Sequence, residues 1–234
     1  MSPALSSQTL LIDADDTLWE NNIYFERAIA DFISFLNHRE RTPLEVRQIL
    51  NDVERDCIVS HGYGLKSFRH ALVKTFERIS VEPITPELHQ AIEGLAHTIA
   101  RQPIQLLAGV EKTLEYLAGR HRLVMVTKGD RHEQSGKVER SGLKGYFSAV
   151  EVVAEKDEPT YAGVIMKHEL AHASTWMVGN SPKSDINPAL RAGINAVFVP
   201  HDDTWILEHE EVIPCEPPRQ LLVLKAFREM AEYF

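Results

Sequence analysis

Residues 10–18 read LLIDADDTL, an apolar run that leads directly into carboxylates at Asp13, Asp15 and Asp16. Like charges this close repel one another, so a buried strand tolerates them only where positive charge lies nearby. Further short apolar runs with polar ends follow helical patterns later in the chain, at 122–129, 149–155, 175–181 and 195–200. Strands that alternate with helices predict an α/β protein with a parallel sheet, whose polar strand ends meet at one edge.

A long helical stretch, residues 20–103, separates the first strand from the others. Apolar residues at three- and four-residue spacing predict helices over 23–40, 42–59, 65–79 and 85–100. Thr42–Pro43 and Thr85–Pro86 each supply a helix start, with an N-cap hydroxyl followed by proline. We therefore expect two domains, an α/β core formed by 1–19 and 104–234 and an inserted four-helix bundle formed by 20–103.

The composition excludes several classes of protein. A net charge of −9 disfavours a nucleic-acid polymer as partner, and no apolar run approaches the ~20 residues of a membrane span. The first residues lack the pattern of a signal peptide, and Cys57 and Cys215 lie in no metal-binding spacing. We expect a cytoplasmic protein with no membrane partner. Monomer and homodimer stay open.

The strand ends carry a consistent set of chemical groups. Clustered carboxylates suit a hard divalent cation such as Mg²⁺, whereas a hydroxyl, a lysine and loop amides suit phosphoryl oxygens. A carboxylate can attack phosphorus, and a second acid two positions later can transfer the proton. The residues concerned are Asp13, Asp15 and Thr17, then Thr127 and Lys128, then Glu155, Lys156 and Asp157, then Asn180, Ser181 and Asp185.

These groups occur in four separate motifs with a fixed order. The motifs are DADDT at 13–17, Thr127 after LVMV, Lys156 after VVAE, and VGNSPKSD at 178–185. The set resembles the haloacid dehalogenase (HAD)-like hydrolase superfamily, in particular its phosphatase branch with a helical cap of the first type. The resemblance implies a three-layer Rossmann-like parallel sheet, with the inserted helices forming the cap.

The resemblance also implies a role for each matching residue. Asp13 would be the nucleophile and Asp15 the acid and base. Thr127, Lys128 and Lys156 would bind the substrate, with Thr127 and Lys156 counted among the catalytic residues. The Mg²⁺ ligands would be Asp13, Asp15 through its backbone carbonyl, Asn180 and Asp185. Asn180 departs from the family, which usually has an aspartate there, so one negative charge at the metal is missing.

The function expected from these roles is Mg²⁺-dependent hydrolysis of a small phosphorylated metabolite, such as a nucleoside monophosphate or a sugar phosphate, through an aspartyl-phosphate. Asp15 argues against dehalogenation, because a halide leaving group needs no proton. A phosphotransferase of the β-phosphoglucomutase kind has the same acid pair and stays open. So does a HAD-fold binding protein whose catalysis is weakened by Asn180.

Two other segments allow a functional interpretation. Residues 168–172 read HELAH, the zinc-protease pattern, on an expected helix over 161–173. A role for that helix in covering the sheet explains the same residues. In the glycine-containing segment 60–69, His61, Lys66 and Arg69 either face an anionic substrate or belong to a solvated turn between helices.

Overall fold

The computed structural model describes residues 7–36, 41–81 and 83–234. The chain divides into two compact units. One comprises Met1–Glu20 and Ile104–Phe234, and the other comprises Asn21–Pro103. Each unit has its own hydrophobic core.

The first unit contains a six-stranded sheet in the order β3-β2-β1-β4-β5-β6, with every neighbouring pair parallel. This topology confirms the predicted α/β class and the parallel sheet. The final strand, β6, was not predicted, because its three residues follow a long loop and are too few to show a pattern. The strands are β1 (Thr9–Ile12), β2 (Arg122–Lys128), β3 (Ala149–Val153), β4 (Thr175–Gly179), β5 (Asn195–Phe198) and β6 (Leu221–Val223).

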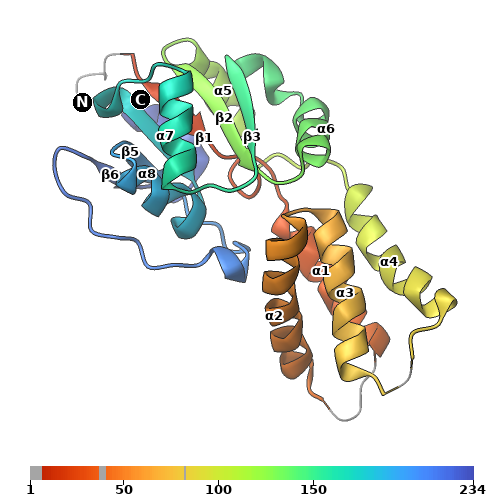
Figure 1. The fold of residues 1–234 in the computed structure, drawn as a ribbon. Helices are drawn as coiled ribbons and strands as arrows, with labels where there is room; N and C mark the ends of the chain where they lie inside the picture. The colour runs from red at the N-terminus through yellow and green to blue at the C-terminus, as the bar shows by residue number, and fades with distance from the viewer. Residues whose placement is uncertain (1–6, 37–40, 82) are drawn as a thin grey trace. The chain divides into compact units, whose positions relative to one another are not determined.

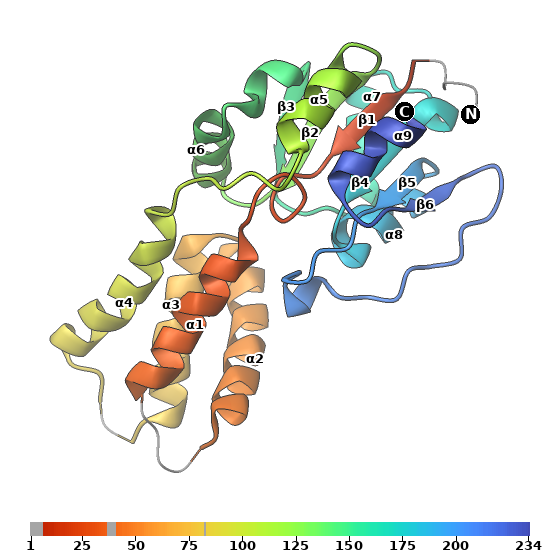
Figure 2. The ribbon, with the colours of Figure 1, turned by 180° about the vertical axis from the view of Figure 1, so that it is seen from behind.

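Side chains alternate between the two faces of the sheet and feed two separate cores. On β1, Leu10 and Ile12 belong to one cluster, whereas Leu11 belongs to the other. The first cluster contains residues of α5 (Val110–Ala118), α6 (Arg131–Ser141) and α9 (Met230–Tyr233). The second contains residues of α7 (Glu158–Lys167) and α8 (Asn187–Arg191). Helices on both faces, visible from the two sides in Figures 1 and 2, give the three-layer arrangement of a Rossmann-like fold.

The second unit contains α1 (Asn22–Leu36), α2 (Pro43–His61), α3 (Leu65–Ile79) and α4 (Pro86–Ala100). Helix α1 packs against α2 and α4, and α3 packs against the same two helices, around one core. The predicted helix starts are confirmed. The Thr42 hydroxyl accepts the Glu45 N–H in a capping box, and the Thr85 hydroxyl accepts the Leu88 N–H.

The segment 60–69 spans the connection between α2 and α3. Gly62 and Gly64 have φ of 74° and 121°, in the region that favours glycine, and this allows the chain to reverse between the two helices. The His61 ring stacks on the His70 ring at a centroid distance of 4.6 Å. A substrate contact by this segment stays a prediction.

The expected helix over 161–173 is wrong in its second half. Helix α7 ends at Lys167, and Glu169 adopts a left-handed conformation with φ of 54°. His168 and His172 therefore do not lie one turn apart on a helix. His168 Nε2 instead lies 2.7 Å from Glu151 Oε1, so the structure does not form the histidine pair of the zinc-protease pattern.

Among the helices in the described ranges, none is long and apolar enough to cross a membrane.

Candidate active site

The carboxyl ends of three central strands bring the predicted residues to one edge of the sheet. Asp13 follows β1, Thr127 lies near the end of β2, and Asn180 follows β4. The Asp13 N–H donates to the Val178 carbonyl at 2.9 Å, which continues the β1–β4 pairing by one residue. Parallel pairing thus places groups more than 100 residues apart in sequence around Asp13.

Lys156 joins two buried acids. Its ammonium contacts the Asp13 carboxylate and lies 2.7 Å from Asp185 Oδ1. Burial opposes the charge of Lys156, but the two carboxylates outweigh it and hold its pKa above the ordinary value. Burial raises the pKa of Asp13 to about 7, against the lowering effect of Lys156 and with a further upward contribution from Asp185. One lysine therefore does not fully offset the negative charge that this strand end buries.

Asp185 is fixed by both of its carboxylate oxygens. Oδ1 accepts from Lys156, and Oδ2 accepts the Ser181 N–H at 3.0 Å. A Cβ atom at Gly179 would lie 2.2 Å from Asp185 Oδ2, so only glycine lets the end of β4 approach this carboxylate. The arrangement holds Lys156 in place beside Asp13.

Thr17 links Asp13 to Asn180. The Thr17 hydroxyl lies 3.0 Å from Asp13 Oδ2 and 3.2 Å from Asn180 Oδ1. One hydroxyl thus touches a carboxylate oxygen and an amide oxygen, both of which are hard donors that suit Mg²⁺. The raised pKa of Asp13 shows that additional positive charge would be favourable at this place. The donor set therefore fits a divalent cation.

Asp15 lies only two residues from Asp13 but has different partners. Its carboxylate accepts from Trp19 Nε1 at 2.7 Å, Gln134 Nε2 at 3.0 Å and Lys137 Nζ at 2.8 Å. Although burial opposes ionisation, the charge of Lys137 and these hydrogen bonds hold the pKa of Asp15 below its ordinary value. The pKa values of the two acids are therefore shifted in opposite directions.

The partners of Asp15 were not found by the sequence reasoning. Gln134 and Lys137 lie on α6, three residues apart on one helix face. Only Gln134 and Val138 are buried on this helix, so a polar residue takes up part of its small buried face. A polar residue on the buried face of α6 was the sequence signal that this face contributes to a functional site.

Lys128 lies among carboxylates. Its ammonium is 2.8 Å from Glu208 Oε1, 3.2 Å from Glu155 Oε1 and 2.7 Å from the Ser184 hydroxyl. Burial of Glu208 opposes its charge, but Lys128 and two serine hydroxyls hold the pKa of Glu208 below its ordinary value. Glu208 was also missed, since it belongs to the loop after β5. The predicted contact of Lys128 with substrate would have to compete with these two acids.

Thr127 is buried on β2, where it pairs in register with Val152. Thr127 is associated with the site only by its position, at the same edge of the sheet as Asp13.

A second group of metal-ligating side chains lies near this edge. Ligand atoms of Asp16, Glu20 and His201 are all within 4.8 Å of one another, which is unique among the described residues. His201 Nδ1 accepts the Asp203 N–H, so the ring proton of neutral His201 is on Nε2, which faces Glu20 at 3.4 Å. Metal binding at Nε2 would move this proton to Nδ1 and break the bond from the Asp203 N–H. Asp16 itself adopts a φ of 60°, a left-handed turn conformation that aspartate tolerates.

Comparisons with known proteins identify the family of this chain. A family model described as haloacid dehalogenase-like hydrolase matches residues 8–193. The chain is 32% identical to human N-acylneuraminate-9-phosphatase over 199 residues, which cover 81% of this chain and 80% of that protein. A match to the rat enzyme of the same name, also at 32% identity, spans 41% of this chain and only 40% of the rat protein.

Solved structures show the same relationship. A haloacid dehalogenase-like family hydrolase from Xanthomonas campestris superposes with a TM-score of 0.82 at 29% identity, over 97% of this chain and 94% of that chain. The L-2-haloacid dehalogenase from Xanthobacter autotrophicus, at 15% identity, has a TM-score of 0.63 over 97% of both chains and shows the shared fold. From the family-model match and the human relative, this chain belongs to the haloacid dehalogenase-like hydrolase family.

Proposed function

We propose that this hydrolase is a phosphatase that cleaves a small phosphomonoester through a phosphorylated Asp13. The observation that carries the proposal is the separation of the two acids. Asp13 lies against Lys156 and Thr17, whereas Asp15 is held by Lys137, Gln134 and Trp19. Two carboxylates with separate partners can perform separate steps of one reaction.

In the first step, a carboxylate oxygen of Asp13 attacks phosphorus, and the bond between phosphorus and the ester oxygen breaks. Lys156 lies beside Asp13 and supplies positive charge for the phosphoryl oxygens. Asp15 donates a proton to the departing alkoxide. The negative phosphoryl group raises the pKa of Asp15 toward the value that this donation needs.

In the second step, Asp15 accepts a proton from water, and the resulting hydroxide attacks phosphorus and releases Asp13. The charge of Lys137 lowers the pKa of Asp15 and so favours the ionised carboxylate that this step requires. The alternation of Asp15 between two protonation states is general acid and base catalysis by one group.

The proposed cofactor is Mg²⁺, held by Asp13, the backbone carbonyl of Asp15 and Asn180. When bound, it supplies positive charge that offsets the charge of the phosphoryl group and of Asp13. Asp185 was also predicted as a ligand. Because both of its oxygens are engaged, we assign it the task of holding Lys156. The helical unit, residues 21–103, is proposed as the cap that selects the substrate.

N-Acylneuraminate 9-phosphate is the first substrate to test, because the human relative carries that activity in its name. The experiment measures phosphate release from this compound, nucleoside monophosphates and sugar phosphates at equal concentration, with Mg²⁺ and with a chelator. The proposal expects Mg²⁺-dependent release that Asp13→Asn abolishes. Equal rates for Asp13→Asn and the unchanged protein would contradict it.

A further inference from the structure

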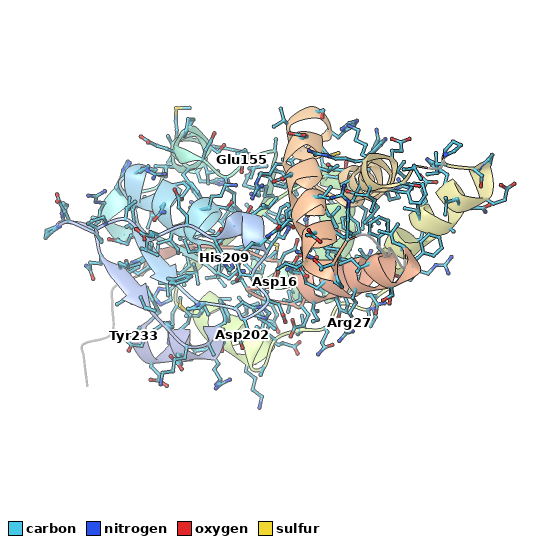
Figure 3. All side chains as sticks on the ribbon, turned by 90° about the horizontal axis from the view of Figure 1, so that it is seen from below. Asp16, Arg27, Glu155, Asp202, His209 and Tyr233 are labelled. Atoms are coloured by element: carbon cyan, nitrogen blue, oxygen red, sulfur yellow. The ribbon has the colours of Figure 1, made fainter. Side chains whose placement is uncertain are left out.

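The loop after β5, residues 199–220, is bonded to the same strand edge that carries Asp13. The Glu208 carboxylate accepts from Lys128 and from the Ser181 hydroxyl at 2.7 Å, and Lys183 Nζ donates to the Leu207 carbonyl at 2.9 Å. Figure 3 labels Asp202 and His209, which belong to this loop. These bonds give the loop a defined position at the end of β4.

Thr204, on this loop, contacts the Asn180 side chain directly. Asn180 Nδ2 donates to the Thr204 hydroxyl oxygen at 2.9 Å, and the same hydroxyl donates to the His201 carbonyl at 2.8 Å. A hydroxyl group has a single proton. In the recorded arrangement the Thr204 hydroxyl donates to the His201 carbonyl, and its oxygen accepts from Asn180 Nδ2. This arrangement directs the NH₂ end of the amide at Thr204.

The same orientation sets the other end of the amide. Asn180 Oδ1 faces Thr17, whose hydroxyl also contacts Asp13 Oδ2. An aspartate would present an oxygen in either orientation, but an asparagine presents an oxygen in one orientation and N–H donors in the other. N–H donors directed at a cation repel it. An asparagine at this position therefore needs a partner that selects its orientation.

We propose that Thr204 is a positioning residue that turns the Asn180 amide so that its oxygen faces the cation held beside Asp13. The inference rests on the proposed function, because it assumes that a divalent cation binds there. It gives the 199–220 loop a role in metal affinity and explains how the chain uses asparagine in place of the family's aspartate.

The test measures the affinity of the 234-residue chain for Mn²⁺ without substrate, by the loss of the free-ion electron paramagnetic resonance signal. Thr204→Val keeps the shape but removes the acceptor, and we expect about tenfold weaker binding or more, as for other side chains that orient metal ligands. Thr204→Ser keeps the hydroxyl and should bind within about twofold of the unchanged protein. Circular dichroism of each variant confirms that it is folded.

Two further variants distinguish an effect on the orientation of the Asn180 amide from a general loosening of the 199–220 loop. His209→Ala removes the 3.0 Å bond to the Thr204 carbonyl but leaves the hydroxyl, so Mn²⁺ affinity should stay unchanged. In an Asn180→Asp background, Thr204→Val should have almost no effect, because the two oxygens of a carboxylate are equivalent.

Unchanged Mn²⁺ affinity in Thr204→Val would overturn the inference while leaving the phosphatase proposal intact. An equal loss of affinity in the unchanged background and in the Asn180→Asp background would overturn it in the same way. If the unchanged protein binds no Mn²⁺ and hydrolyses no phosphomonoester, the proposed function fails and the inference fails with it.

Discussion

Glu54 is a buried carboxylate in the core of the helical unit, and its replacement by glutamine should change how stability depends on pH. The residue is 6% exposed, and Oε2 has no hydrogen-bond partner. Burial raises its pKa from 4.5 to about 7, with Arg47 and Arg55 lowering it and Glu26 raising it. Glu54→Gln keeps the shape and removes the charge.

The magnitude follows from proton linkage. Below pH 4.5, Glu54 is protonated in both the folded and the unfolded state, so its burial then costs no ionisation energy. As the pH rises through the folded value near 7, the folded state progressively loses stability relative to the unfolded state. The shift of 7 − 4.5 = 2.5 pH units corresponds to about 3 kcal/mol in total, of which about 2.5 kcal/mol falls between pH 5 and pH 8.

Urea denaturation at pH 5 and pH 8 measures this difference. All three tryptophans, Trp19, Trp176 and Trp205, lie outside the helical unit, so fluorescence follows the α/β unit alone. Circular dichroism follows the helices of both units, and most helical residues belong to the helical unit. Any destabilisation caused by burying the glutamine amide is the same at both pH values. It therefore cancels when the free energies of unfolding at pH 5 and pH 8 are subtracted. Glu77→Gln, at an exposed position on α3, is the matched control. If Glu54→Gln and the unchanged protein lose the same free energy of unfolding between pH 5 and pH 8, the account of Glu54 is wrong.

Three changes at the candidate site have distinct expected results. Lys137→Met removes the cation beside Asp15, so kcat should fall about tenfold or more in a steady-state assay, with KM near its original value. Lys137→Arg keeps the positive charge and should recover part of the rate. Gly179→Ala forces the Asp185 carboxylate away from Lys156, so phosphatase activity should fall at least about tenfold; unchanged activity would show that the close approach is not needed. Lys156→Met leaves two buried acids without their cation and should destabilise the α/β unit by about 3–5 kcal/mol at neutral pH, with partial recovery in thermal unfolding as Asp13 is protonated at lower pH.

Sequence patterns predicted the elements that repeat a regular period over enough residues. The parallel strands and the N-caps of α2 and α4 are confirmed, because alternation and capping are local properties. Helix α7 ends earlier than expected because the chain turns at Glu169, and no residue type in HELAH marks that turn. Strand β6 pairs only because the 199–220 loop delivers it to β5.

The candidate site divides in the same way. The strand-end rule predicts that Asp13, Thr127 and Asn180 lie on one edge of the sheet, because it depends only on strand direction. The partners of Asp15 and Lys128 depend on tertiary contacts instead. Lys137 lies 122 residues from Asp15 in sequence, and Glu208 lies 80 residues from Lys128. The sequence around Asp15 or Lys128 does not indicate either partner. The amide orientation of Asn180 is likewise set by a loop with no recognisable pattern.

Direct detection of a phosphoryl group on Asp13 tests the central claim. The Asp15→Asn variant is mixed with p-nitrophenyl phosphate, whose leaving group departs without a proton, so that the first step proceeds and the second stalls. Acid quench and borohydride reduction convert an aspartyl-phosphate to homoserine, which peptide mass spectrometry assigns to a position. The account predicts homoserine at position 13. The account is contradicted if the unchanged protein turns over the substrate but the stalled Asp15→Asn variant carries the phosphoryl group on another residue. It is also contradicted if that variant then carries no phosphoryl group at all.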